Sequence, residues 1–339
     1  MRSKVLFYLT KYKSVNDAVQ YYLQIISEAL TGQTNFHVYE NLKEAKSADI
    51  IVTYFVKDYF VARIMHPRST IINWFQGILP EESYMWQKSK LRYYMYSFME
   101  WFCLKTSDYN FFVSEAMLDH YQRKYNYKGN KYFIMPCFNA QMKDDFEMKV
   151  DRPSFVYIGS LSKWQCLDET LEVFKELNKQ IPTASIEILT NKQEEARQLL
   201  KKYQIVNGSV NYVPLEELSE YLVKFKFGFL IREDININNV ATPNKLCTYM
   251  ASGVIPVYSD VIDSFKIHMK GVKHKITLAT QFDLEEAKNQ IVEYERSTVI
   301  DYTELHSDYT KLFNVFYNKD QYVGKIRLAL NELDIKEKV

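Results

Sequence analysis

The chain has 339 residues, of which 47% are hydrophobic and 25% are charged. This length is long for one domain and comfortable for two, and the hydrophobic content excludes an intrinsically disordered chain. The net charge is only +1 and no long basic block exists, so no nucleic-acid partner is expected. No run of about 18 apolar residues predicts a membrane-spanning helix. The cysteines lie far apart, which indicates free thiols of a cytoplasmic protein: Cys103, Cys137, Cys166 and Cys247.

The first half of the chain alternates continuous apolar runs with helical patterns. Such runs are typical of strands that are buried on both faces of a parallel sheet. The predicted strands are 4–9, 49–55, 69–74, 109–113 and 133–135. The predicted helices are 17–30, 87–104 and 115–125, with Ser114 as the N-cap of the last.

A charged stretch that is poor in apolar residues, 139–153, is predicted to be a linker, and the alternation restarts after it. The predicted strands are then 155–158, 185–189, 210–212, 227–231 and 255–258, and the helices between them are 167–177, 193–203 and 215–225. Two such series predict an α/β protein with two doubly wound, Rossmann-like domains that face a ligand cleft. The expected domains are 1–150 and 151–305. The segment 306–339 is expected to be helical, and in one possible arrangement it packs on the first domain.

The segment 232–260 carries the strongest local signals. Thr242 is expected to act as an N-cap and Pro243 to take the first helical position, where its missing N–H is no loss. Gly253 is expected to end that helix in a left-handed conformation, directly before the apolar run 255–258. The pattern predicts a strand, a loop, a capped helix and a second strand.

The start of that helix is a candidate anion site. Unpaired backbone N–H groups of Asn244, Lys245 and Leu246, together with the Lys245 ammonium, are expected to face the loop that follows the preceding strand. Arg232 lies at the end of that strand. These groups favour a phosphate or diphosphate, and the alternative is an ordinary capped crossover with a surface lysine.

A second candidate follows the strand 155–158. Gly159 directly after a strand allows a ligand or another backbone to approach closely, and ligands bind at this edge of open α/β sheets. Lys163 is then suited to assist an anion, and Trp164 to cover a base or a sugar. The alternative is a tight turn with an exposed lysine.

Several motifs are absent from the sequence. It contains no Gly-x-Gly, no Asp-x-Asp, no Gly-x-Ser-x-Gly and no pair of histidines four residues apart. We therefore expect no metal and no cofactor.

The two motifs together resemble glycosyltransferase family 4, a group of GT-B enzymes. The run 240–257, VATPNKLCTYMASGVIPV, is similar to a sequence pattern of that family, and the loop Gly159-Ser-Leu-Ser-Lys-Trp is similar to the family's phosphate-proximal loop. In the first half, Trp74-Phe-Gln-Gly77 is similar to a segment that lines the cleft. The resemblance implies a GT-B fold and transfer of a sugar, with retention, from a nucleoside diphosphate sugar to a glycan or lipid-linked acceptor, in surface polysaccharide biosynthesis.

The sequence also departs from the family. Two glutamates that the family carries eight positions apart correspond here to Val240 and Thr248. Ser160 stands where an arginine is more common, and Gln76 where a histidine is usual. A rearranged site that uses Arg232 with Glu233 and Asn239 is one hypothesis.

The resemblance implies a role for each candidate residue. Arg232 and Lys245 are expected to be catalytic, and Gln76 and Gly77 to lie on the acceptor side. The donor is expected to contact Gly159, Ser160, Lys163, Glu233, Asn239, Thr242, Pro243, Asn244, Leu246 and Thr248.

Two other functions remain open, a non-catalytic GT-B-like binding subunit and a sugar-nucleotide epimerase. The aromatic and basic segment 83–105 is either a core helix or a weak contact with the inner face of a membrane.

Overall fold

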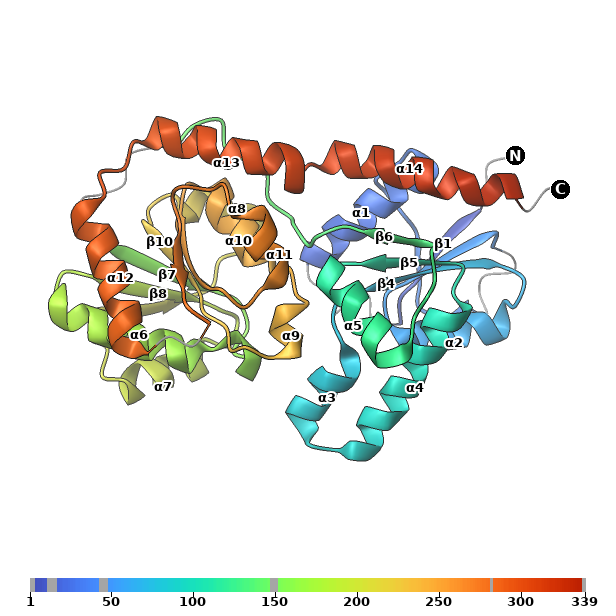
Figure 1. Cartoon of the computed structure of the whole chain (residues 1–339), viewed down its shortest axis with the longest axis horizontal. Helices are drawn as coiled ribbons and strands as arrows, with labels where there is room; N and C mark the ends of the chain where they lie inside the picture. The colour runs from blue at the N-terminus through green and yellow to red at the C-terminus, as the bar shows by residue number, and fades with distance from the viewer. Residues whose placement is uncertain (1–3, 11–16, 43–47, 147–151, 281–282, 337–339) are drawn as a thin grey trace. The chain divides into compact units, whose positions relative to one another are not determined.

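The computed structural model describes residues 4–10, 17–42, 48–146, 152–280 and 283–336. The chain divides into two compact units (Figure 1). Unit 1 holds residues 1–137, 240–242 and 318–339, and unit 2 holds residues 138–239 and 243–317. The boundary expected between residues 150 and 151 lies outside the described residues.

Unit 1 is built on a parallel sheet. Its strands are β1 (Val5–Tyr8), β2 (Val38–Tyr39), β3 (Ile50–Thr53), β4 (Thr70–Phe75), β5 (Tyr109–Phe112) and β6 (Tyr132–Ile134). Its helices are α1 (Asp17–Thr31), α2 (Val56–Met65), α3 (Leu79–Gln87), α4 (Lys90–Thr106), α5 (Glu115–Tyr125) and α14 (Lys319–Lys336). The strand order is β2-β1-β3-β4-β5-β6, so the chain runs outward from β1 in one direction and then from β3 in the other.

The helix α14 packs against α1 within unit 1 (Figure 1). Lys319 forms an ion pair of 2.8 Å with Glu28, and Arg327 Nη2 donates a hydrogen bond of 3.2 Å to the Glu28 carbonyl oxygen. These contacts join α14 to the last turns of α1.

Unit 2 is built in the same way. Its strands are β7 (Ser154–Ile158), β8 (Ser185–Leu189), β9 (Gly208–Asn211), β10 (Phe227–Leu230), β11 (Ile255–Ser259) and β12 (Ile276–Leu278). Its helices are α6 (Leu167–Gln180), α7 (Gln193–Lys202), α8 (Leu215–Leu222), α9 (Asn236–Asn239), α10 (Asn244–Ala251), α11 (Asp263–His268), α12 (Leu284–Ser297) and α13 (Tyr302–Phe316). The parallel sheet has the order β12-β11-β10-β7-β8-β9, so the strand order reverses between β7 and β10.

The predicted fold class is confirmed by the two parallel sheets and the helices around them. Every residue of β5, β10 and β11 is buried, as expected for strands that are covered on both faces. The predicted helix 87–104 corresponds to α4, which begins three residues later and ends two residues later. The segment 83–105 is divided between α3 and α4, because Lys88 takes a left-handed conformation with φ of 51° and Ser89 caps α4 by accepting from the Arg92 amide. Among the described residues, no helix is both long enough and apolar enough to cross a membrane.

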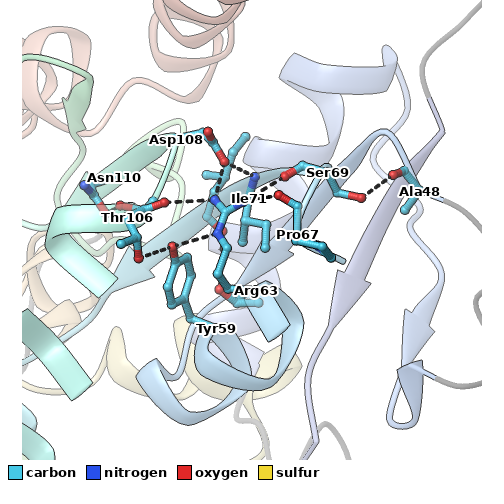
Figure 2. A network of polar contacts seen from close by, with 12 residues as sticks. Ala48, Tyr59, Arg63, Pro67, Ser69, Ile71, Thr106, Asp108 and Asn110 are labelled. Carbon is cyan, nitrogen blue, oxygen red and sulfur yellow. Dashed lines mark hydrogen bonds and ion pairs between the residues drawn. The ribbon is translucent and has the colours of Figure 1, made fainter. Parts of the chain in front are cut away.

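A polar network fixes the amino ends of β4 and β5 in unit 1 (Figure 2). Arg63 Nη2 contacts Asp108 Oδ2 at 2.5 Å and donates to the Thr106 carbonyl oxygen at 2.9 Å. The same Asp108 oxygen accepts from the Ile71 amide at 2.8 Å, and Arg63 Nε donates to Tyr59 Oη at 3.2 Å. The network joins α2, α4, β4 and β5, and its charged groups are paired within the chain. It therefore serves stability, and ligands are expected at the opposite, carboxyl edge of the sheet.

Candidate functional site

The carboxyl ends of β7 and β10 lie side by side in unit 2, where the strand order reverses. In open α/β sheets this point forms the crevice in which ligands bind. Three segments meet there: the loop after β7, the residue that follows β10, and the start of α10. They bring together Gly159, Arg232 and Lys245, all of which the sequence singled out.

Gly159 brings the loop and the lysine into close contact. Its φ is +125°, which side-chain-bearing residues rarely adopt. A Cβ added at this position would lie 2.8 Å from Lys245 Cε and 3.1 Å from Lys245 Nζ. The backbone conformation thus requires a glycine, and a side chain at this position would also displace the end of Lys245.

Arg232 and Lys245 share one neutral hydrogen-bond acceptor, the side-chain oxygen of Gln165. Gln165 Oε1 accepts from Arg232 Nη2 at 2.5 Å and from Lys245 Nζ at 2.8 Å. Arg232 Nη1 also donates to the backbone oxygens of Gln165 at 2.8 Å and Ile231 at 3.1 Å. The Lys245 ammonium lies 3.9 Å from the centre of the Tyr157 ring. The sequence analysis missed Gln165, because a lone glutamine after a strand carries no recognisable signal.

Both cations are held in an environment that disfavours their charge. Arg232 is 4% exposed, and burial lowers its pKa. Burial, followed by repulsion from Arg232, lowers the pKa of Lys245 well below its ordinary value. Among the described residues no carboxylate forms an ion pair with either side chain or raises either pKa. The arrangement is two adjacent cations without an anion.

The start of α10 differs from the predicted capping pattern. The helix begins at Asn244 with Pro243 as its N-cap residue, so Thr242 does not cap it. Thr242 belongs to unit 1, where its hydroxyl oxygen accepts from the Cys137 amide at 2.9 Å. The Leu246 amide, expected to be free, donates to the Pro243 carbonyl oxygen at 3.3 Å. Asn244 Oδ1 is buried without a hydrogen-bond partner in the structure. The end of the helix matches the prediction, since Gly253 has a φ of +67°.

Four other candidate donor-binding residues are either exposed or already hydrogen-bonded within the chain. Ser160, Lys163 and Glu233 are exposed. Asn239 Nδ2 donates to Asp234 Oδ1 at 2.7 Å and to the Val261 carbonyl oxygen at 2.9 Å, so its amide already holds its own loop.

The positions that lack the family's glutamates contribute no carboxylate. The Thr248 hydroxyl donates to the Asn244 carbonyl oxygen at 3.0 Å, one turn earlier in α10. Val240 belongs to unit 1, where its carbonyl oxygen accepts from the Ser114 hydroxyl at 2.6 Å. Ser114 also accepts from the Met117 amide at 3.0 Å and is therefore the predicted cap of α5.

Gln76 and Gly77, the candidate acceptor-side residues, line a pocket in unit 1 of about 210 Å³. The pocket lies beyond the carboxyl ends of β3 and β4. Its walls are Tyr54, Phe55, Val56, Phe75, Gln76, Gly77, Leu79, Glu82 and Glu100. Glu100, which is fully buried on the aromatic helix α4, was not predicted from the sequence. Among the residues that the structure describes, no group of three or more His, Cys, Asp or Glu residues is arranged to hold a metal ion.

No protein-family model and no curated protein matches the sequence. Solved structures do match. The chain is similar to a sucrose-phosphate synthase from Thermosynechococcus elongatus, at 13% identity over 99% of this chain and 100% of that one, with a TM-score of 0.71. It is also similar to Anabaena HepE in complex with UDP-glucose, at 10% identity over 97% and 100%, with a TM-score of 0.73. S. aureus TarM in complex with UDP gives a TM-score of 0.64 at 11% identity, over 83% of this chain and 55% of that one.

At such low identity these similarities define the fold alone. The chain has the two-domain, Rossmann-like GT-B fold that the resemblance predicted, and its structural neighbours are glycosyltransferases.

Proposed function

We propose that this protein is a glycosyltransferase that moves a sugar from a nucleoside diphosphate sugar to a glycan or lipid-linked acceptor. The pair of cations Arg232 and Lys245 carries the proposal. They lie at the strand ends where this fold binds ligands, and they share only the neutral oxygen of Gln165. A buried cation without an anion is unfavourable, so an anionic ligand completes the site. The structural neighbours in complex with UDP or UDP-glucose support a diphosphate as that anion.

In the proposed reaction the bond between the anomeric carbon and the diphosphate breaks, an acceptor hydroxyl oxygen forms the new bond with retention, and the proton of that hydroxyl passes to the departing diphosphate. Negative charge grows on the departing diphosphate. Arg232 binds phosphate oxygens through its planar guanidinium, and Lys245 acts as a point charge. Because both are positioned before the reaction, they stabilise the transition state without reorganisation. The two cations supply the charge that a divalent metal supplies in other transferases, so we propose a metal-independent reaction.

Gln165 is part of this proposal because its oxygen occupies the point between the two cations. A phosphate oxygen carries negative charge and forms stronger hydrogen bonds with both. The ligand is therefore expected to displace the Gln165 side chain, while the absent side chain of Gly159 leaves room for Lys245. The buried, unpartnered Asn244 Oδ1 at the start of α10 is an acceptor that a sugar or ribose hydroxyl would satisfy.

A non-catalytic nucleotide-binding subunit is the second candidate function. Thr248 and Val240 favour it, because neither supplies the carboxylate that family 4 enzymes carry. Both candidates predict nucleotide binding, and only the transferase predicts turnover.

The test begins with calorimetric titration of UDP, GDP, ADP and CMP into the full chain, with and without magnesium. One nucleoside diphosphate is expected to bind equally well in both conditions, and Lys245→Met is expected to weaken that binding. Binding by none of them would refute the proposal. Incubation with the matching nucleotide sugar and acceptor glycans, followed by NMR of the anomeric proton, then separates retaining transfer, inverting transfer and epimerisation. No product with any acceptor favours the binding subunit.

The surface of α2, α3 and α4 supports a further part of the proposal, a peripheral contact with a membrane. Nine of the sixteen exposed large apolar side chains in the described residues lie between residues 61 and 101: Val61, Ile64, Met65, Trp86, Leu91, Tyr94, Met95, Phe98 and Trp101. Every exposed charged residue between 57 and 105 is basic: Lys57, Arg68, Lys88, Lys90, Arg92 and Lys105. This combination suits an anionic lipid surface, and each basic residue near such a surface contributes about 1 kcal/mol.

The membrane contact is tested by co-sedimentation with vesicles of phosphatidylcholine alone or mixed with phosphatidylglycerol. Binding to the anionic vesicles only, reduced by salt and by Leu91→Ser with Phe98→Ser, is the expected result. Val206→Ser is the matched control, because Val206 is 90% exposed in unit 2. We propose on this basis that the protein works in the cytoplasm at the inner face of the membrane, in surface polysaccharide biosynthesis. Absence of binding to anionic vesicles would remove the membrane contact and leave the transferase proposal intact.

A further inference from the structure

The pocket in unit 1 contains two carboxyl groups with different surroundings. Glu100 is fully buried, and both of its oxygens are occupied. Its Oε1 accepts from the Leu79 amide at 3.0 Å and lies 3.4 Å from Tyr121 Oη, and its Oε2 accepts from Tyr125 Oη at 2.8 Å. Glu100 therefore holds α3 and α5 against α4 and forms part of the wall.

Glu82 has no comparable set of partners. Its carboxyl lies against Gly77, where an added Cβ would be only 2.0 Å from Glu82 Oε1. The Ile78 backbone is the one hydrogen-bonding group that lowers its pKa. Burial, followed by repulsion from Glu81, raises the Glu82 pKa to about 7. The Glu82 side chain is thus half-buried in the wall of the pocket, and its carboxyl retains hydrogen-bonding capacity toward the pocket.

Lys124, which contacts the carboxylates beside the pocket, is paired with Glu81 and lies near Glu100. Lys124 Nζ lies 2.7 Å from Glu81 Oε1 and 3.7 Å from Glu100 Oε2. His120 Nε2 lies 3.6 Å from the same Glu81 oxygen. Neither Lys124 nor His120 affects the pKa of Glu82. The pocket itself is therefore acidic and lacks a cation that would receive an anionic group.

The rest of the lining includes three aromatic side chains and the side-chain amide of Gln76. Tyr54, Phe55 and Phe75 contribute apolar surface, and Gln76 Nε2 is a buried donor without a hydrogen-bond partner in the structure. A sugar ring offers the complement of this lining, since its C–H faces pack on aromatic rings and its hydroxyl groups both donate and accept. A carboxyl beside an amide can accept from one hydroxyl and donate to another. A pocket of about 210 Å³ suits a single ring.

We propose that this pocket binds one uncharged sugar ring of the acceptor, with Glu82 and Gln76 holding its hydroxyl groups, and that the acidic wall rejects acceptors whose ring carries a phosphate or a carboxylate. The identification of this sugar as part of the acceptor rests on the proposed function, whereas the binding of a sugar in unit 1 does not depend on it. No lysine, arginine or histidine is among the described residues that line the pocket, so the negative charge of such a ring would be partly buried without a compensating cation, and the rejection is expected for that reason.

The test uses saturation-transfer NMR on the full chain, with methyl glucoside, methyl galactoside and N-acetylglucosamine as neutral probes. Glucose 6-phosphate and glucuronate are the anionic probes, and glucosamine is the cationic one. At least one neutral sugar is expected to bind, and the anionic ones at least about 10-fold more weakly. Glu82→Leu is expected to weaken neutral-sugar binding about 10- to 100-fold, because a hydrogen bond to a charged group is lost. Glu82→Gln keeps the shape and removes the charge, so it is expected to narrow the gap between neutral and phosphorylated sugars.

Two controls keep the result interpretable. Glu115→Gln changes an exposed glutamate on the neighbouring helix α5 and is expected to leave all the probes unaffected. Nucleoside diphosphate binding, which depends on unit 2, reports whether each variant is folded and tests the proposed function separately. Failure of every neutral sugar to bind would overturn the proposal. So would equal binding of the phosphorylated sugar, or glucosamine binding 10-fold more tightly than the neutral sugars.

Discussion

Lys245 is expected to destabilise the protein that contains it, and Lys245→Met tests this. The ammonium donates a hydrogen bond of 2.8 Å to Gln165 and lies 3.9 Å from the centre of the Tyr157 ring. A hydrogen bond to a charged group contributes about 1.5–3 kcal/mol and a cation–π contact about 0.5–2 kcal/mol. The pKa of Lys245 is nevertheless lowered well below its ordinary value, so desolvation and repulsion from Arg232 outweigh both contacts.

Methionine has a similar length and no charge, and it removes that cost. We expect Lys245→Met to raise the free energy of unfolding by about 1–2 kcal/mol, because replacing uncompensated buried charge by apolar groups is often stabilising. This corresponds to about 2–4 °C in Tm for each kcal/mol in a domain of this size. The same substitution should weaken nucleoside diphosphate binding about 10- to 100-fold, since one charge-assisted hydrogen bond is lost. Stability and binding should therefore change in opposite directions.

The pH dependence has a defined sign. A lysine whose pKa is lowered by folding binds its proton more tightly in the unfolded chain. Stability should then rise with pH between the lowered pKa and the ordinary value near ~10.4. Lys245→Met should remove this rise.

Lys226→Met is the matched control, because Lys226 lies in the same unit and forms an ion pair of 2.7 Å with Glu295. That variant should lower stability and leave nucleotide binding unchanged. Denaturant unfolding and calorimetric titration of both variants measure all four quantities. If Lys245→Met lowered stability and left binding unchanged, the lysine would be a structural residue and the anion site would be wrong.

Gly159→Ala should lower the free energy of unfolding by more than about 1 kcal/mol, because the φ of +125° is unfavourable for alanine, and it should displace Lys245, because the added Cβ meets the lysine. Gly271→Ala is the control: its Cβ meets nothing within 4 Å, so it should be near neutral in the same unfolding assay. Folding raises the pKa of Glu82 to about 7, so the contribution of Glu82 to stability should fall by up to about 3 kcal/mol as pH rises from ~4.5 to ~7. Glu82→Gln should make the pH dependence of stability shallower, and the raised pKa of Glu100 should leave a remaining fall; an unchanged profile would contradict the raised pKa of Glu82. Arg63→Met should lower the free energy of unfolding by about 1–3 kcal/mol, because it leaves several partly buried acceptors unpaired, and nucleotide titration should show no change in binding.

The sequence determined the fold class of this protein, and the reason is the period of its apolar residues. Continuous runs such as 109–113 and 227–231 can be buried only as central strands of parallel sheets, and helical patterns between them leave few topologies. The glycines at 159 and 253 could be located from the sequence because their positions after a strand and a helix require conformations that other residues avoid. Arg232 and Lys245 could be named because a strand end and a helix start are recognisable locally.

Only the tertiary structure decided which groups surround those residues. Gln165 contacts two cations that lie 67 and 80 positions away in the chain, and no local pattern marks such a contact. The sequence offered Thr242 as a helix cap, whereas a partner 105 positions away, the Cys137 amide, takes its hydroxyl oxygen. Neither Glu82 nor Glu100 is marked as unusual by its neighbours in the sequence. Their raised pKa values arise from burial, and burial is a property of the packed molecule that spacing along a chain does not contain.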